Sequence, residues 1–238
     1  MPVLLLAQGD VKARDLLKKA ISARYGFNPP ALESLRIDFK GRARAKVGPI
    51  TAWVPVEVTA SFCFPTKMRW DFTVKPIGVP VQRGVEAFDG QQYRRLRGGG
   101  SPVLVKDANA LQSMRRRLWS VAALLLTPLG EHFVRLAAND DGSLQATHTQ
   151  LNDAVNMLLR PDHSLERVQV ECVNPDNERA QTFVLKAAET QAPVDGLMLP
   201  TKVSTFWDDE PYFEAEPVRV CSDARFQDSL FTLVEEHV

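Results

Sequence analysis

A strict alternation of apolar and polar side chains near the N-terminus constrains the fold most strongly. Over residues 34–47 every odd position is apolar or small, and every even position is polar. The same alternation resumes over residues 52–64 after a Gly-Pro turn, and over residues 68–74 after a Pro-Thr turn. Because successive side chains of a strand point to opposite faces, this pattern predicts three long antiparallel strands with one apolar and one polar face.

Two helices are predicted from apolar residues at helical spacing. The first covers about 11–25 after the N-capping residue Asp10, and the second begins near Asp107 and stops at about 127–130. Strands at about 79–88 and 92–96 flank an Asp-Gly turn, which is typical of a hairpin. Turn residues in the second half delimit further strands, expected at about 132–138, 143–149, 153–160, 165–173, 181–188, 197–207 and 212–221.

The composition is that of a folded globular protein, with 45% apolar and 24% charged residues. No linker or low-complexity tract divides the chain, so we expect a single domain over residues 1–238. Its fold class is mainly β (α+β): a large curved antiparallel sheet whose concave apolar face is covered by the two amphipathic helices. No apolar run approaches the length of a spanning helix, and the first eight residues lack the basic region and the length of a secretory signal.

Residues for catalysis or metal binding are sparse. The four histidines form no H-E-x-x-H or H-x-H pair, and no phosphate-binding, nucleotide-binding or serine-nucleophile motif is present. Cys63, Cys172 and Cys221 have no metal-ligand spacing, so we expect reduced, structural thiols. The sequence predicts no catalytic residue, no metal and no cofactor. An enzyme acting on a lipid or glycan stays open, because catalytic groups can converge in space from distant positions.

Basic residues cluster between Arg94 and Arg117, flanked by Tyr93 and Trp119. Nucleic-acid binding would predict such a cluster with aromatic neighbours. However, the isoelectric point is near 6.9 and no nucleic-acid module is recognisable. We therefore favour a solvated helix face and strand end, and expect no nucleic-acid partner.

Apolar side chains of the concave face are the candidates for lining a ligand chamber. Arg83 is added to them because the alternation of its strand places it on the same face. The candidates are Val56, Val58, Phe62, Trp70, Phe72, Val81, Arg83 and Val85. A buried unpaired charge is costly, so Arg83 is expected to pair with a carboxylate, bind a polar group of a ligand or escape through a bulge near Gly84. The aromatic residues could equally form a filled core.

Opposite charges divide between the two halves of the chain. Residues 1–119 carry 21 basic and 9 acidic side chains, whereas residues 120–238 carry 8 and 20. The basic residues of the first strands share the polar register, so we expect a basic stripe on the convex face that meets anionic headgroups or an acidic partner. Its members are Arg36, Lys40, Arg42, Arg44, Lys46, Lys67, Arg69 and Lys75, and the acidic later strands are expected at the opposite end of the sheet.

Several short segments, in this order and spacing, resemble the LolA-like lipoprotein carriers, also described as lipoprotein-sorting proteins. They are Ala13–Ala20, Leu32–Arg36, Phe64–Trp70, Glu86–Gly90, Asp195–Lys202 and Asp228–Phe231. The resemblance implies a half-open β-barrel with a helical lid, an apolar chamber for acyl chains and a location in the bacterial periplasm or cell envelope. No local motif places the functional arginine of those carriers in this sequence.

The leading hypothesis is a non-enzymatic binder or carrier of a lipid or another acylated ligand, active as a monomer. Lipid or lipoprotein acyl chains would be its cargo, and a membrane surface or an acidic protein would be its partner. The alternative is an envelope interaction or sensing module that shares the fold but has a filled core. Whether the concave face is hollow distinguishes the two.

Overall fold

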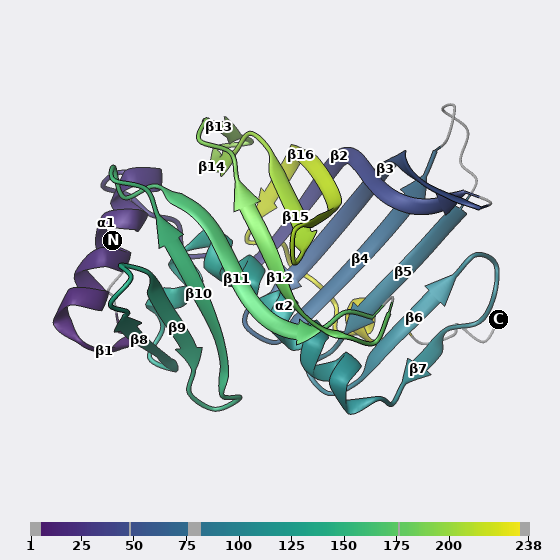
Figure 1. Ribbon diagram of the computed structural model, residues 1–238, viewed down its shortest axis with the longest axis horizontal. Coiled ribbons are helices and arrows are strands. Elements are labelled where there is room, and N and C mark those ends of the chain that lie inside the picture. The colour runs from purple at the N-terminus through teal and green to yellow at the C-terminus, as the bar shows by residue number, and fades with distance from the viewer. Residues whose placement is uncertain (1–5, 48, 76–81, 176, 234–238) are drawn as a thin grey trace.

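The computed structural model describes residues 6–47, 49–75, 82–175 and 177–233. Its main feature is a 14-stranded sheet in the order β1-β8-β9-β10-β11-β12-β15-β16-β2-β3-β4-β5-β6-β7. All neighbouring strands are antiparallel except β1 and β8, which are parallel. The two edges do not meet, so the sheet curves into a half-open barrel instead of a closed one (Figure 1).

The strands of the first half confirm the alternation and its turns. They are β1 (Gln8–Gly9), β2 (Ser34–Val47), β3 (Ile50–Cys63), β4 (Lys67–Val74), β5 (Gln82–Phe88), β6 (Tyr93–Arg97) and β7 (Val103–Val105). Those of the second half are β8 (Val134–Ala138), β9 (Leu144–His148), β10 (Asp153–Leu159), β11 (Leu165–Val173), β12 (Ala180–Ala187), β13 (Gln191–Val194), β14 (Leu197–Pro200), β15 (Val203–Trp207) and β16 (Glu210–Ser222). The sequence did not predict β1, β7 or β13.

One predicted strand, at 197–207, is divided in the structure. Its first part, β14, leaves the main sheet and pairs with β13 as a separate hairpin, while β15 stays in the sheet between β12 and β16. β14 ends at Pro200, which has no backbone N–H to continue a hydrogen-bonded ladder. The prediction of one continuous strand was therefore wrong.

Both predicted helices are confirmed together with their caps. In α1 (Val11–Tyr25) the carboxylate of Asp10 accepts a hydrogen bond from the backbone N–H of Ala13, and in α2 (Ala108–Leu125) Asp107 does the same for Ala110. A 3₁₀ turn, η2 (Thr127–Gly130), follows α2, and a short helix, α3 (Ser229–Thr232), lies near the C-terminus.

The helices and the sheet enclose two apolar clusters on the concave side. The first cluster contains residues of α1, Trp119 of α2, and strands β8 to β12 and β15. In the second cluster, Met114 and Leu118 of α2 pack with residues of β2, β3 and β4. Figure 1 shows α2 running between the two limbs of the curved sheet, with α1 beside β8 to β10. The predicted fold class, a curved sheet with helices on its apolar face, is confirmed.

Candidate ligand-binding cavity

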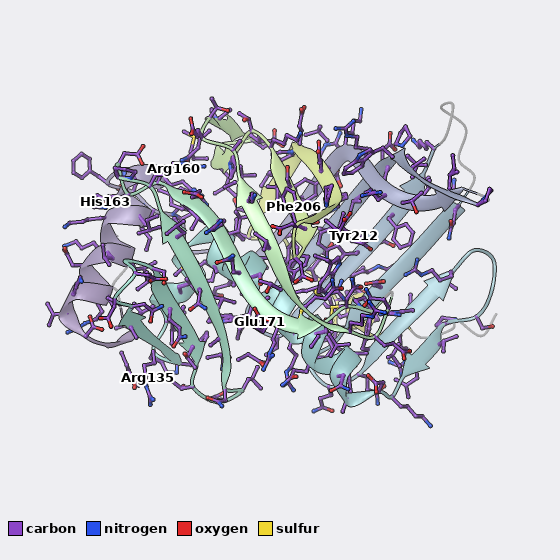
Figure 2. All side chains as sticks on the ribbon, in the orientation of Figure 1. Arg135, Arg160, His163, Glu171, Phe206 and Tyr212 are labelled. Atoms are coloured by element: carbon purple, nitrogen blue, oxygen red, sulfur yellow. The ribbon has the colours of Figure 1, made fainter. Side chains whose placement is uncertain are left out.

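An apolar cavity of about 270 Å³ lies on the concave side of the sheet. Its floor is formed by β2 to β5, its far wall by β12, β15 and β16, and its cover by α2 and the end of β14. Five of the predicted chamber residues line it, namely Val56, Val58, Phe62, Trp70 and Phe72. Tyr212 extends into the same region from β16 (Figure 2).

The floor of the cavity follows directly from the strand alternation. Cross-strand pairing places Val58 between Phe39 of β2 and Phe72 of β4, so one row of apolar side chains crosses three strands. Trp70 meets Phe62 and Phe213 edge to face, with ring centroids 6.2 and 6.4 Å apart. These contacts hold the large rings in fixed positions along the cavity wall.

The cover of the cavity is also apolar. Val121, Leu124 and Leu125, from the last two turns of α2, line it above the sheet, and Leu199 of β14 lines it beside them. Leu125 and Leu199 are almost fully buried. A ligand in the cavity would therefore lie between an apolar strand floor and an apolar helix.

The prediction that Arg83 and Val85 face the cavity was wrong, and Val81 lies outside the described residues. β5 pairs with β4 without a register shift, so that Arg83 is opposite Thr73 and Val85 is opposite Asp71, both on the polar, convex face. Arg83 is exposed there. The misleading apolar residues of this strand face α3, which contacts β4 and β5 from the convex side and buries Phe231.

The concave register of β5 and β6 instead carries a charged cluster. Glu86 faces the cavity beside Trp70, its partner on β4, and lies 3.2 Å from Arg97, 3.8 Å from Arg95 and 4.0 Å from Arg117 of α2. Glu86, Arg97 and Arg117 line the cavity. We refer to Glu86, Arg95, Arg97 and Arg117 as the Glu86 cluster.

Burial shapes the electrostatics of this cluster. Burial acts to lower the pKa of Arg117, but the neighbouring ionisable groups, with Glu86 the largest contributor, together outweigh burial, so that the pKa lies above its ordinary value. Burial, reinforced by Glu86, raises the pKa of Tyr93, whose hydroxyl accepts a hydrogen bond from Arg95. At neutral pH the guanidinium is therefore charged and the phenol neutral.

Sequence reasoning missed the Glu86 cluster because it assigned these residues to a solvated surface. Two signals were present. Tyr93, Arg95 and Arg97 alternate with Arg94 and Leu96, which is the period of a two-faced strand. Glu86 stands two residues before Phe88, which packs in the core.

The convex face carries most of the predicted basic stripe, but acidic side chains pair with it. Arg42 lies 3.3 Å from Glu214, Arg44 lies 3.0 Å from Glu210, and Arg69 binds Asp71 through two hydrogen bonds of 2.8 Å. Arg36 is half-exposed and lies 3.9 Å from Asp38. The side chain of Lys46 lies outside the described residues.

The expected separation of the charges along the sheet was wrong for β16. This acidic strand is the direct neighbour of β2 in the middle of the sheet, not at its opposite end. The pairing of Arg44 with Glu210 joins residues 166 positions apart in the sequence. Part of the charge difference between the halves is therefore neutralised within the sheet, where β2 meets β16.

Other chemistry-bearing residues lie apart from the cavity or from one another. His163 is near α1, at the far side of the molecule (Figure 2). No group of three or more His, Cys, Asp or Glu side chains that could hold a metal ion occurs among the described residues. Cys63, Cys172 and Cys221 are free thiols. In the part of the chain that the structure describes, no helix has both the length and the apolar character needed to cross a membrane.

Comparison with known proteins identifies the fold. No family model matches the chain, and none of the curated proteins does. A LolA superfamily protein from Nitrosomonas europaea superposes with a TM-score of 0.52 at 12% sequence identity, over 95% of this chain and 99% of that chain. A DUF1329 family protein from Desulfovibrio piger gives 0.51 at 11% identity, over 98% and 100%. The chain therefore has a LolA-like fold, at a sequence identity of only 11–12% to these two structures.

Proposed function

We propose that this protein is a non-enzymatic binder or carrier of a lipid or acylated ligand in the bacterial cell envelope. The observation that carries the proposal is the apolar cavity between the sheet and α2. Burial of an acyl chain contributes about 0.8 kcal/mol per CH₂ group, so an apolar cavity can bind such a chain without any chemical step. The proposal assigns no catalytic residue, metal or cofactor.

The size of the cavity favours a small cargo. Its volume of about 270 Å³ is just below the ~300–1,000 Å³ typical of small-molecule sites. We therefore expect one acyl chain to enter at a time, with α2 and β14 as its cover. Lipid or lipoprotein acyl chains in the periplasm remain the proposed source, in keeping with the LolA-like fold.

The alternative, an interaction or sensing module with a filled core, predicts that the concave side has no room for a ligand. The cavity among the described residues supports the carrier over this alternative. Partner capture through the convex stripe would instead be lost when Arg36, Arg42 and Arg44 are replaced by Glu, with lipid binding unchanged.

The proposal is tested by extracting the purified protein with organic solvent, identifying lipids by mass spectrometry, and measuring displacement of a fluorescent fatty acid. The variant Val58→Trp should fill the cavity and weaken binding at least tenfold, because Val58 is buried in its floor. Thr73→Trp places the same side chain on the convex face of the adjacent strand and is the matched control. Absence of both extracted lipid and displacement at micromolar protein would contradict the proposal.

A further inference from the structure

The cavity is not uniformly apolar, and its polarity changes across the sheet. Over β2, β3 and β4 the concave rows are apolar, as in Ile37, Ala60 and Trp70. The same row continues into Glu86 of β5 and Arg95 of β6. A ligand that spans the row therefore meets an apolar surface at one end and charged groups at the other.

The charged end has an excess of positive charge. In the Glu86 cluster three guanidinium groups share one carboxylate, so the cluster has a net charge of +2. Arg97 is half-exposed where it lines the cavity, and its guanidinium lies 5.3 Å from the Phe72 ring centroid. This end of the cavity is therefore suited to an anion.

The hydrogen bonding of the cluster is also incomplete. The Nε and Nη2 atoms of Arg117 are buried and make no hydrogen bond to any of the described residues, although Nη2 is within 4.0 Å of Glu86. Trp70 Nε1, next to Glu86 in the same row, likewise has no acceptor in the described part of the chain. All three are donors, and a buried donor without an acceptor is costly.

From the excess positive charge and the unmatched donors, we propose that the Glu86 cluster binds the anionic head of a single-chain amphiphile. The head is a carboxylate or a phosphate monoester, held by Arg97 and Arg117, while the chain lies over the apolar floor formed by β2 to β4. This inference rests on the proposed function and adds the charge of the ligand to it. Glu86 then acts as a counter-charge that holds the two arginines in place and limits their attraction for the head.

The test compares three ligands that share a 12-carbon chain: laurate, dodecyl phosphate and dodecanol. Each displaces the neutral fluorophore N-phenyl-1-naphthylamine from the full-length protein, so the probe itself carries no charge. We expect the protein to bind an anionic ligand roughly tenfold more tightly than dodecanol, which is the scale of one charge-assisted hydrogen bond. Whichever of laurate and dodecyl phosphate binds more tightly shows whether the site prefers a carboxylate or a phosphate monoester as the head group.

Substitutions in the Glu86 cluster test whether this cluster causes the preference for anionic ligands. Arg97→Gln and Arg117→Gln should each weaken binding of the anionic ligands far more than binding of dodecanol, so that most of the preference is lost. Arg97 is half-exposed and can be replaced with little risk to folding. Glu86→Gln should act in the opposite direction and tighten binding of the anionic ligands, because it removes the competing carboxylate. The matched control is Arg83→Gln, an exposed arginine on the opposite face of the same strand.

The outcomes are distinguishable. Equal binding of all three ligands by the unmodified protein would overturn this inference and leave the proposed carrier function standing. An anionic preference that survives in both arginine variants, or that Arg83→Gln also removes, would overturn the assignment to the Glu86 cluster. Binding of none of the three ligands would overturn the inference together with the function on which it rests.

Discussion

Gly41 shows how closely two strands approach at the centre of the sheet. A Cβ atom at this position would lie 1.9 Å from the carbonyl oxygen of Glu214 and 2.7 Å from the Cα of Ala215. Both atoms belong to the backbone of β16, so no side-chain rotation can relieve the overlap. Glycine is therefore required here by the approach of the strands, at the point where the first and last parts of the chain join.

We expect Gly41→Ala to lower the free energy of unfolding by about 1–3 kcal/mol, because the two strands must separate to admit the methyl group. Urea denaturation followed by tryptophan fluorescence measures the change. Gly99→Ala is the control, since no atom lies within 4 Å of a Cβ there, and its effect should stay within about 0.5 kcal/mol. Equal stability of Gly41→Ala and the unmodified protein would show that β16 can move away freely.

At the scale of elements, the junction of β2 with β16 is where the charges of the two halves meet. Arg44 pairs with Glu210 across this junction, and Arg42 pairs with Glu214. Lys202, from the loop between β14 and β15, also pairs with Glu214 at 2.5 Å. Exposed pairs of this kind contribute little individually. Together they favour the observed register of β2 against β16, because a shift of one residue between these strands would place each arginine opposite a different residue.

Reversal of the Arg44 and Glu210 pair tests this junction. Arg44→Glu alone should destabilise the protein by about 0.5–1 kcal/mol through like-charge repulsion, and Arg44→Glu combined with Glu210→Arg should recover most of that loss. A double-mutant cycle by urea denaturation at low and high salt measures the coupling, which should weaken at high salt. If the two single changes are simply additive, the pair does not stabilise the junction.

At the scale of the whole molecule, the two faces of the sheet are suited to different tasks. The concave side holds the cavity and the Glu86 cluster, whereas the convex side carries the basic stripe, partly neutralised by acidic neighbours. We propose that the exposed part of the stripe meets anionic headgroups. Its clearest described member is the half-exposed Arg36, whose contact with Asp38, at 3.9 Å, is a long one.

Binding to anionic vesicles should accordingly weaken when the salt concentration is raised from roughly 20 to 200 mM, because the screening length shortens to below ~10 Å. Co-sedimentation with vesicles of phosphatidylglycerol measures this, and neutral phosphatidylcholine vesicles give the background. Arg36→Glu should reduce binding severalfold, whereas Arg179→Glu, an exposed arginine outside the stripe, should not. Vesicle binding that is insensitive to salt would contradict this use of the convex face.

The sequence by itself determined the elements whose signals are local. The period-two pattern of β2, β3 and β4 and the caps Asp10 and Asp107 were sufficient, because side-chain alternation and helix capping depend on residues a few positions apart. The same alternation predicted five of the residues that line the cavity.

Only the tertiary structure decided which face of β5 is concave and which charges meet. Val85 and Ala87 suggested the cavity side of β5, but α3, from the far end of the chain, packs against the convex face there, and Glu86 lies on the concave face opposite Trp70. Likewise, the contacts of Glu86 with Arg117 and of Arg44 with Glu210 depend on how the sheet curls and on where its last strand inserts. The local alternation of side chains predicts that a strand has two different faces. Which of these faces becomes buried depends on segments that are distant in sequence.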